Sequence, residues 1–381
     1  MIKAILQLTV LQRPVHAICL CLAVLASQAS AGLFSEDYLR IDQYIEENPQ
    51  QKNVMQRFSQ IVRDPAVSIN RNIDTPTRIA VIYPAIQASD YWHRSLKAFE
   101  ARLKELDVNY ELKTYLSRPS VDISLQSEQL ADALRWNPDY LVFTIDALRH
   151  RTMIERILTR GRPKLILQNI TTPVKLWQYQ RPFMYVGFDH AIGTELLAES
   201  MQHQVAGQKS PVKYSMLYFS KGYVSQMRGD TFASHVSGNP HIKQVSSFYT
   251  DGNRLRAKEA TLKTLQQNPD LDMIFACSTD IALGAIDALN EKGLSDQILI
   301  NGWGGGDSEL TELQAGKLDL TVMRMNDDNG VAMAEGIKLD LEGRGNQVPH
   351  IYSGDIRLLS KETSAEQIEK YKKWAFRYSG Y

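Results

Sequence analysis

The sequence contains few cysteines and none of the short motifs that mark the common enzyme families. Of three cysteines, Cys19 and Cys21 lie in the N-terminal leader, so Cys277 has no intrachain disulfide partner once that leader is removed. The patterns H-E-x-x-H, C-x-x-C, G-x-S-x-G and the Walker A loop are absent. The histidines also lack the spacing of metal ligands. We therefore predict no catalytic residue, no metal site and a buried thiol at Cys277.

An excess of one charge and long apolar runs are also missing. The chain has 43 lysines and arginines against 43 aspartates and glutamates, and residues 1–31 hold two of the basic residues and no acidic one. This balance does not favour nucleic acid or an anionic membrane as a partner. Beyond residue 31, no segment is apolar over the roughly 20 residues that a membrane-spanning helix needs.

Residues 1–31 have the features of a cleavable signal peptide. Lys3 and Arg13 supply positive charge, residues 17–26 are apolar, and Ala29, Ser30 and Ala31 form a small-residue cleavage site. The alternative, an uncleaved membrane anchor, is disfavoured because this apolar stretch is only about half the length of a span. We expect cleavage after Ala31 and export of the remaining chain.

The next segment, residues 32–74, is predicted to be an N-terminal helical extension. One helical stretch runs from Ser35 to Ile45 and a second from Gln51 to Arg63. We interpret the extension as an arm that packs on the folded body. A contact surface for a partner is the alternative.

From residue 78 onward, short apolar strands alternate with amphipathic helices. This alternation predicts an α/β protein with parallel sheets that helices cover on both faces. The pattern restarts near residue 184, which indicates two Rossmann-like lobes: residues 75–183 plus 326–351, and residues 184–325 plus 352–381. Strands are expected at residues 79–83, 108–115, 140–145, 165–167, 184–188, 214–219, 245–249, 273–277, 298–300 and 320–325, with an extended segment at 351–358.

Polar and aromatic residues follow several of these strands. The carboxyl edge of a parallel sheet is where open α/β folds bind ligands. Amide, hydroxyl and carboxylate groups there match the hydroxyls of a small polyhydroxylated molecule, tryptophans can flank a ring, and arginines add fixed positive charge. The candidates are Gln87, Ser89, Trp92, Asn169, Arg228, Ser278, Thr279, Asp280, Trp303 and Arg324.

Each candidate also has a purely structural interpretation. Trp92 lies on the apolar stripe of a predicted helix, so it can belong to the core. Ser278 and Asp280 can cap the helix that follows them, and Asn169 can hold a turn. Arg324 can pair with the acidic residues 327 and 328, and Arg228 can be a surface arginine.

Several longer segments of the sequence resemble those of one protein family. They include QASDYW, YLVFTIDALRHR, LILQNITTPV, YVGFDH, YFSKGYVSQMRGDTF, ACSTDIALGAIDAL, INGWGGG, TVMRMNDD and AFRYS. In these words the chain resembles the type I periplasmic binding proteins, and among them the autoinducer-2 receptors of quorum sensing. The similarity covers most of the chain after residue 31, and the N-terminal extension only loosely.

The resemblance implies a fold, a location, a ligand and a partner. The fold would be two Rossmann-like lobes joined by three hinge crossovers, closing over a ligand in the periplasm. The ligand would be the furanosyl borate diester form of autoinducer-2, with boron as part of the ligand and no separate cofactor. The partner would be the periplasmic domain of a LuxQ-type membrane hybrid sensor kinase. All ten candidates match positions that contact the ligand in the family, with Arg228 and Arg324 beside the borate.

A charge argument accompanies this resemblance. A tetrahedral borate ester carries one negative charge, which is costly to bury without compensation. Two arginines would leave the site positive, and we interpret Asp280 as the group that offsets the second charge.

Three other functions are weighed against this one. A ribose-like sugar-binding protein of an ABC importer would have the same fold and a similar site, and it is the main alternative. A carbohydrate hydrolase needs two carboxylates across a bond, and only Asp280 stands out. A transcription regulator of this fold is disfavoured by the signal peptide and by the absence of a DNA-binding segment.

Overall fold

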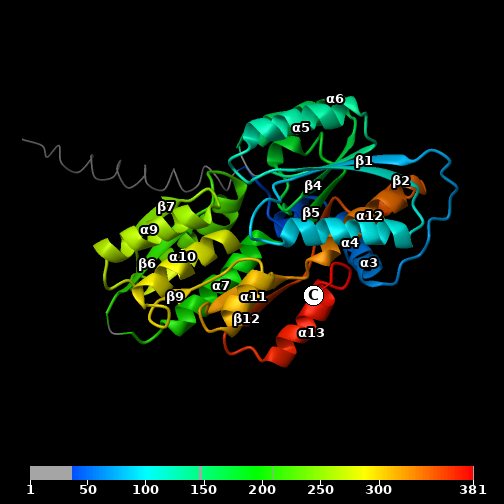
Figure 1. Cartoon of the computed structure of the whole chain (residues 1–381). Coiled ribbons are helices and arrows are strands. Elements are labelled where there is room, and N and C mark those ends of the chain that lie inside the picture. The colour runs from blue at the N-terminus through cyan, green and yellow to red at the C-terminus, as the bar shows by residue number, and fades with distance from the viewer. Residues whose placement is uncertain (1–36, 146–147, 209, 381) are drawn as a thin grey trace, which may run out of the picture.

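The computed structural model of the chain describes residues 37–145, 148–208 and 210–380. The predicted signal peptide and its cleavage site after Ala31 lie outside these residues. Within them, no helix is long and apolar enough to cross a membrane. The chain forms two α/β lobes that lie side by side (Figure 1).

The first lobe is built on a six-stranded sheet in the order β11-β5-β4-β3-β1-β2, in which every pairing is parallel. Its central strands are apolar throughout because helices cover both faces. Along β1, Ile79 and Val81 pack against the helices on one face of the sheet, and Ala80 and Ile82 pack against the helices on the other face. The strands are β1 (Thr77–Tyr83), β2 (Tyr110–Leu116), β3 (Tyr140–Phe143), β4 (Lys164–Gln168), β5 (Met184–Gly187) and β11 (Ile351–Ser353).

The helices of this lobe form two layers. The helices α3 (Gln50–Arg63), α4 (Tyr91–Glu105) and α12 (Asp327–Leu341) share one core cluster, and α5 (Ile123–Arg135) and α6 (Leu148–Arg160) belong to the other. The predicted stripe of Trp92, Phe99 and Leu103 is buried on α4.

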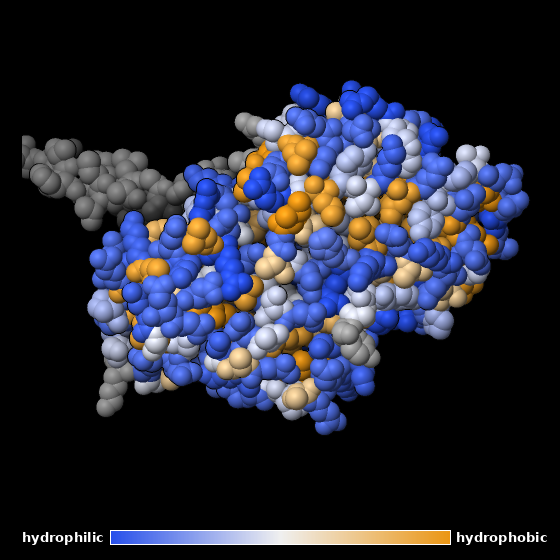
Figure 2. All heavy atoms as spheres, in the orientation of Figure 1, coloured by the Kyte–Doolittle hydropathy of each residue, from blue (hydrophilic) through white to orange (hydrophobic). Residues whose placement is uncertain are grey.

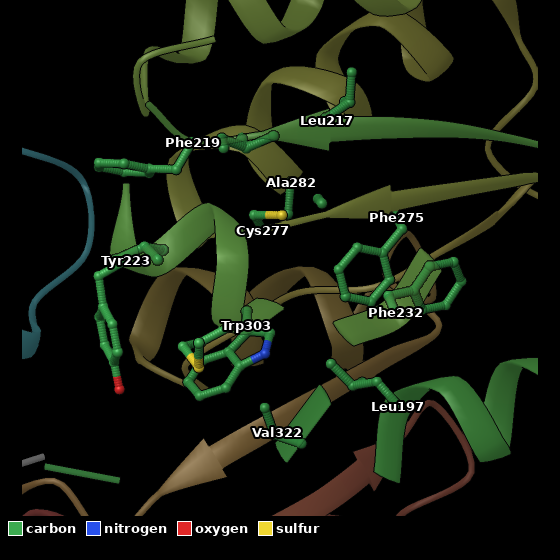
Figure 3. Packing of buried hydrophobic residues seen from close by; sticks show 14 of the residues in the cluster. Leu197, Leu217, Phe219, Tyr223, Phe232, Phe275, Cys277, Ala282, Trp303 and Val322 are labelled. Carbon is green, nitrogen blue, oxygen red and sulfur yellow. The ribbon is translucent and has the colours of Figure 1, made fainter. Parts of the chain in front are cut away.

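The second lobe contains a four-stranded parallel sheet in the order β7-β6-β8-β9. Isolated bridges from Asn301 to Leu320 and from Gly304 to Met323 continue it towards a two-stranded antiparallel sheet, β10-β12. Figure 3 shows its core, where the rings of Phe232 and Phe275 stack 4.0 Å apart. The strands are β6 (Val212–Tyr218), β7 (Ile242–Tyr249), β8 (Met273–Ala276), β9 (Leu299–Ile300), β10 (Leu320–Arg324) and β12 (Ile356–Ser360).

Helices again flank the sheet, and one of them is irregular. The segment η2 (Ser225–Asp230) is a π-helix that leads directly into α8 (Thr231–Ser237). The other helices are α7 (His190–Gln204), α9 (Arg254–Gln267), α10 (Thr279–Lys292), α11 (Asp307–Gln314) and α13 (Ala365–Ala375).

The chain crosses between the lobes three times, after β5, after β10 and after β11. Two backbone hydrogen bonds tie these crossings together, from Gly354 N to Gly187 O (2.8 Å) and from Met325 N to Asp355 O (2.9 Å). The predicted two lobes and three crossovers are therefore confirmed. β5, which begins at the predicted start of the second lobe, pairs with β4 and β11 of the first. The lobe limits themselves stay a prediction.

One expected element is wrong. The predicted extended segment 351–358 is two strands in different sheets, with β11 parallel to β5 and β12 antiparallel to β10. The break occurs because Gly354 bonds to the first crossing, so the chain changes lobes there.

The N-terminal arm, residues 37–63, contacts both lobes. Asp37 forms an ion pair with Arg151 of α6 (2.9 Å), and Arg40 pairs with Glu195 of α7 (2.8 Å). The ring of Tyr38 packs 5.2 Å from that of Tyr223 in the second lobe. The first predicted helix begins later than expected: α2 spans Ile41–Glu47, because Tyr38 pairs with Val174 in a β-bridge, and α3 follows. The interpretation as a packing arm is confirmed, and its use as a partner surface stays untested.

The outer surface is mostly hydrophilic on the face shown in Figure 2, with apolar patches between hydrophilic side chains. The site described next lies between the lobes.

Candidate functional site

A small cavity lies between the lobes, where strands of both sheets end. Nine of the ten predicted site residues line it, from elements far apart in the sequence. They are Gln87, Ser89, Trp92, Asn169, Arg228, Ser278, Thr279, Trp303 and Arg324. Ligand contact by these residues stays a prediction.

Arg228 enters the cavity from the π-helix η2. Its guanidinium carbon lies over the ring of Trp303, 3.6 Å from the centroid, and its Nη1 donates to the carbonyl of Cys277 (2.8 Å). The side chain is 4% exposed and its Nε has no partner. Burial, and then the charge of Arg324, lower the pKa of Arg228 to about 9, so the group is still charged at neutral pH. The surface interpretation of Arg228 is therefore wrong.

Arg324 enters from the end of β10. Its guanidinium lies 4.0 Å from the ring centroid of Tyr91, and its Nε has no partner. The alternative interpretation, an ion pair of Arg324 with Asp327 or Asp328, is wrong. Asp327 accepts from the backbone N–H groups of Tyr378 and Ser379, and Asp328 pairs with Arg377. Burial lowers the pKa of Arg324.

The two arginines share one electrostatic property. Among the residues that the structure describes, no carboxylate oxygen lies within 4 Å of either guanidinium. Arg228 is held instead by the ring of Trp303 and the carbonyl of Cys277, and Arg324 lies beside the ring of Tyr91. A buried positive charge without an ionic partner is costly, and an anion in the cavity would relieve that cost.

Two tryptophans form walls of the cavity. Trp303 is buried, and its Nε1 donates to Thr194 Oγ1 of α7 (3.0 Å), which fixes the ring. Trp92 packs against the rings of Tyr83 and Tyr91, each with centroids 4.8 Å apart. Trp92 is thus both a core residue, as the apolar stripe indicated, and a wall of the cavity.

Polar groups are spaced around these walls. Gln87 Nε2 donates to Pro84 O (2.6 Å), and Ser278 Oγ is buried without a partner. Asn169 takes a left-handed conformation (φ 66°), and its Oδ1 lies 3.2 Å from His190 Nε2. Asn169 therefore holds a turn and faces the cavity at the same time. Thr279 begins α10 at the cavity wall.

Asp280 is the predicted residue that does not line the cavity. Its carboxylate reaches across to the first lobe and accepts from the backbone N–H groups of Ala88 (2.8 Å) and Ser89 (3.2 Å). Ser278, the residue before α10, makes no side-chain cap. Asp280 therefore joins the lobes directly. Asp280 is the second residue of α10, and from this position its side chain points past the cavity to the first lobe.

Several residues of the site were missed by the sequence analysis. His190 is fully buried between Asn169 and Arg228, and burial, followed by the charges of Arg228 and Arg324, holds the pKa of His190 well below its usual range. The word YVGFDH contains it, but a single histidine gave no functional signal. Apolar and aromatic walls come from Pro84, Tyr91, Pro119, Phe219 and Val224.

The described residues contain no group of three or more histidine, cysteine, aspartate or glutamate side chains that could hold a metal ion. Cys277 is buried at the end of β8, and burial raises the pKa of its thiol to about 12. The expected buried thiol is confirmed.

Comparison with known families identifies the fold and its class. A model described as periplasmic binding protein domain matches residues 79–344, well over half of the chain. The chain belongs to the periplasmic binding protein family. Members of this family are binding proteins rather than enzymes, and membership implies a periplasmic location.

Similar curated proteins are sugar-binding proteins by name. The D-allose-binding periplasmic protein of Escherichia coli is 30% identical over 120 residues, or 31% of this chain and 38% of that protein. The ribose import binding protein RbsB of Escherichia coli is 29% identical over 136 residues, or 35% of this chain and 44% of that protein. The matches thus span less than half of either relative.

Solved structures support the fold. A galactofuranose binding protein superposes with a TM-score of 0.67 at 17% identity, covering 79% of this chain and 100% of that chain. A periplasmic solute binding protein from Actinobacillus succinogenes with bound D-allose gives a TM-score of 0.64 at 20% identity, covering 77% and 100%. At this identity the likeness shows the two-lobed fold alone.

Proposed function

We propose that this chain is a LuxP-type periplasmic receptor that binds autoinducer-2, as its furanosyl borate diester, in the cavity between the lobes. Its occupancy would be relayed to a LuxQ-type membrane hybrid sensor kinase. The observation that carries this proposal is the pair of buried arginines, Arg228 and Arg324, with no carboxylate partner. A site built this way favours an anion over a neutral sugar of the same size.

The remaining lining fits a small oxygen-rich ring. Trp92 and Trp303 can flank its less polar faces, and Gln87, Asn169 and Thr279 offer amide and hydroxyl groups to its oxygens. The cavity lies between lobes that contact each other through Asp280, so a ligand enters when they separate and is enclosed when they meet. A ligand that prefers the enclosed form shifts the population towards it, and a membrane partner can read that shift.

A second candidate is a sugar-binding protein of an ABC importer, with a ribose-like or allose-like ligand. The named relatives favour it, since each of those compared above binds a sugar by name. The aromatic walls and the amide groups serve a neutral sugar equally well. The partner would then be a transporter permease. In this candidate the arginines would donate hydrogen bonds to sugar hydroxyls, and their positive charge would have no counterpart in the ligand.

Calorimetric titration separates the two. The mature protein would be titrated with autoinducer-2 precursor in boron-free buffer, with and without added borate, and with D-ribose and D-allose. Borate-dependent binding is expected. Binding of a sugar but not of the precursor would overturn the proposal in favour of the importer.

Arginine variants test the charge argument. Arg228→Ala and Arg324→Ala should weaken the borate-dependent ligand by at least tenfold more than the borate-free form, because a charge-assisted hydrogen bond contributes about 1.5–3 kcal/mol. Gln87→Ala is the matched control, since it alters an uncharged wall residue and should weaken both forms alike. Equal losses in the arginine variants would refute the charge argument.

A further inference from the structure

Glu309 is a buried carboxylate next to the site but outside the cavity. It is the third residue of α11, and its side chain is fully buried. From the third position of a helix, a glutamate can reach back to the backbone that precedes the helix, where the helix dipole also favours negative charge. Here that backbone is the loop of residues 302–306, which carries Trp303.

The carboxylate binds this loop at two points. Its Oε1 accepts from Trp303 N (3.0 Å), and its Oε2 accepts from Gly305 N (2.8 Å) and from Thr321 Oγ1 of β10. All three partners act as donors, which is the pattern that an ionised carboxylate requires. No lysine or arginine among the described residues lies within 4 Å of it, so hydrogen bonds rather than an ion pair stabilise its charge.

The loop fits only with glycine around this carboxylate. A Cβ on Gly302 would lie 2.6 Å from Glu309 Cδ, and a Cβ on Gly304 would lie 2.7 Å from Arg324 Nη2. Gly304 and Gly305 also have φ values of 151° and 65°. The glycines of the segment INGWGGG are therefore required by the close approach of Glu309 and Arg324 and by the backbone conformation of the loop.

Through this loop, Glu309 acts on the arginine pair in two ways. It fixes the backbone of Trp303, on whose ring the Arg228 guanidinium lies. Its charge also reaches both guanidiniums: burial lowers the pKa of Arg228 and Arg324, and the charge of Glu309 acts in the opposite direction on both. The compensating role was assigned to Asp280, whose carboxylate instead bonds the backbone of the first lobe.

We propose that Glu309 is a positioning residue that orients Trp303 and limits the positive charge of the cavity, and so sets the preference between anionic and neutral ligands. This inference rests on the proposed function. Removing the charge should loosen the loop and weaken every ligand. It should also raise the positive potential, so that the anion loses less affinity than the neutral form.

The test compares Glu309→Gln with Thr321→Val, which removes one donor to Glu309 without changing charge. For each variant, affinities for the autoinducer-2 precursor with and without borate are measured. Glu309→Gln should weaken both, while the borated-to-borate-free affinity ratio rises by about threefold to tenfold, the size of a partly screened unit charge. Thr321→Val should leave that ratio unchanged. An unchanged ratio in Glu309→Gln overturns the charge role.

A second readout needs no ligand. The near-ultraviolet circular dichroism band of Trp303, assigned by difference from Trp303→Phe, should change in Glu309→Gln, with far-ultraviolet spectra confirming the fold. An unchanged band overturns the positioning role. If the wild-type protein shows no borate preference, the proposed function fails, and this band still decides whether Glu309 orients Trp303.

Discussion

At the scale of single residues, Asn169 combines a backbone role with a binding role. Its φ of 66° suits glycine or asparagine, whereas alanine in this left-handed conformation destabilises the fold by about 1 kcal/mol. We expect Asn169→Ala to be less stable than Asn169→Gly by that amount in urea unfolding. Both variants should lose ligand affinity equally, because both lack the amide. Equal stability of the two would show that the turn tolerates a Cβ.

Residues of the site were predictable where a polar cluster directly follows a strand. Asn169 directly follows β4 of the first lobe and Arg324 ends β10 of the second, and both strands end at the cavity between the lobes. Asp280 was placed there by the same reasoning, but its side chain passes to the other lobe. Glu309 was missed because a glutamate in the first turn of a helix is usually solvated, and only its distant partners, such as Thr321, reveal its role.

At the scale of elements, close helix pairs depend on glycine. Gly330 of α12 faces α4, and a Cβ there would lie 2.4 Å from Ser95 O, a backbone atom that cannot easily move. Gly330→Ala should therefore destabilise the protein by about 1–3 kcal/mol.

Gly336, on the same helix, is the matched control. Its Cβ would lie 3.3 Å from the flexible end of Met184, so Gly336→Ala should be neutral or stabilising by up to about 1 kcal/mol through helix propensity. Urea unfolding of both variants measures this. Similar effects of the two would contradict the packing argument.

A buried histidine on α6 links stability to pH. His150 is fully buried, with Nε2 2.8 Å from Gln126 Oε1 of α5, and burial lowers the pKa of His150 to about 4. The unfolded chain therefore binds this proton more tightly, and stability falls as pH drops below the unfolded pKa of about 6.5.

His150→Gln removes this titration. Between pH 7 and 5, its loss of unfolding free energy should be smaller than that of the wild type by about 2 kcal/mol. Chemical unfolding at the two pH values checks it. The same pH slope in both proteins would mean that His150 is not held neutral in the fold.

Most elements were predictable because the central strands are covered on both faces and so read as continuous apolar runs, as in β3 and β8. The change of sheet at Gly354 was not, because it depends on a hydrogen bond to Gly187 far along the chain. A local pattern contains no information about such a pairing.

At the scale of the whole molecule, Asp280 favours contact between the lobes. Asp280→Asn leaves one of the N–H groups of Ala88 and Ser89 without its acceptor, so the closed form becomes less populated. Apparent ligand affinity should fall by about tenfold, since it scales with the closed fraction. Titration calorimetry measures the loss.

Asp287→Asn provides the comparison for this experiment. Asp287 lies on the same helix but pairs with Arg254 away from the cavity, so its loss should leave affinity unchanged. Unchanged affinity in Asp280→Asn as well would mean that the contact does not control closure.

The contacts of the N-terminal arm depend on whether the two lobes are together or apart. Asp37 is fastened to α6 and Arg40 to α7, with only a few residues between them. When the lobes separate, so short a segment cannot keep both ion pairs, and one of them must break. The released segment then becomes accessible to proteases. Limited proteolysis around residues 37–40 should accordingly slow when ligand is added. The segment that precedes the two lobes thus converts a movement of the lobes into a change in its own susceptibility to cleavage.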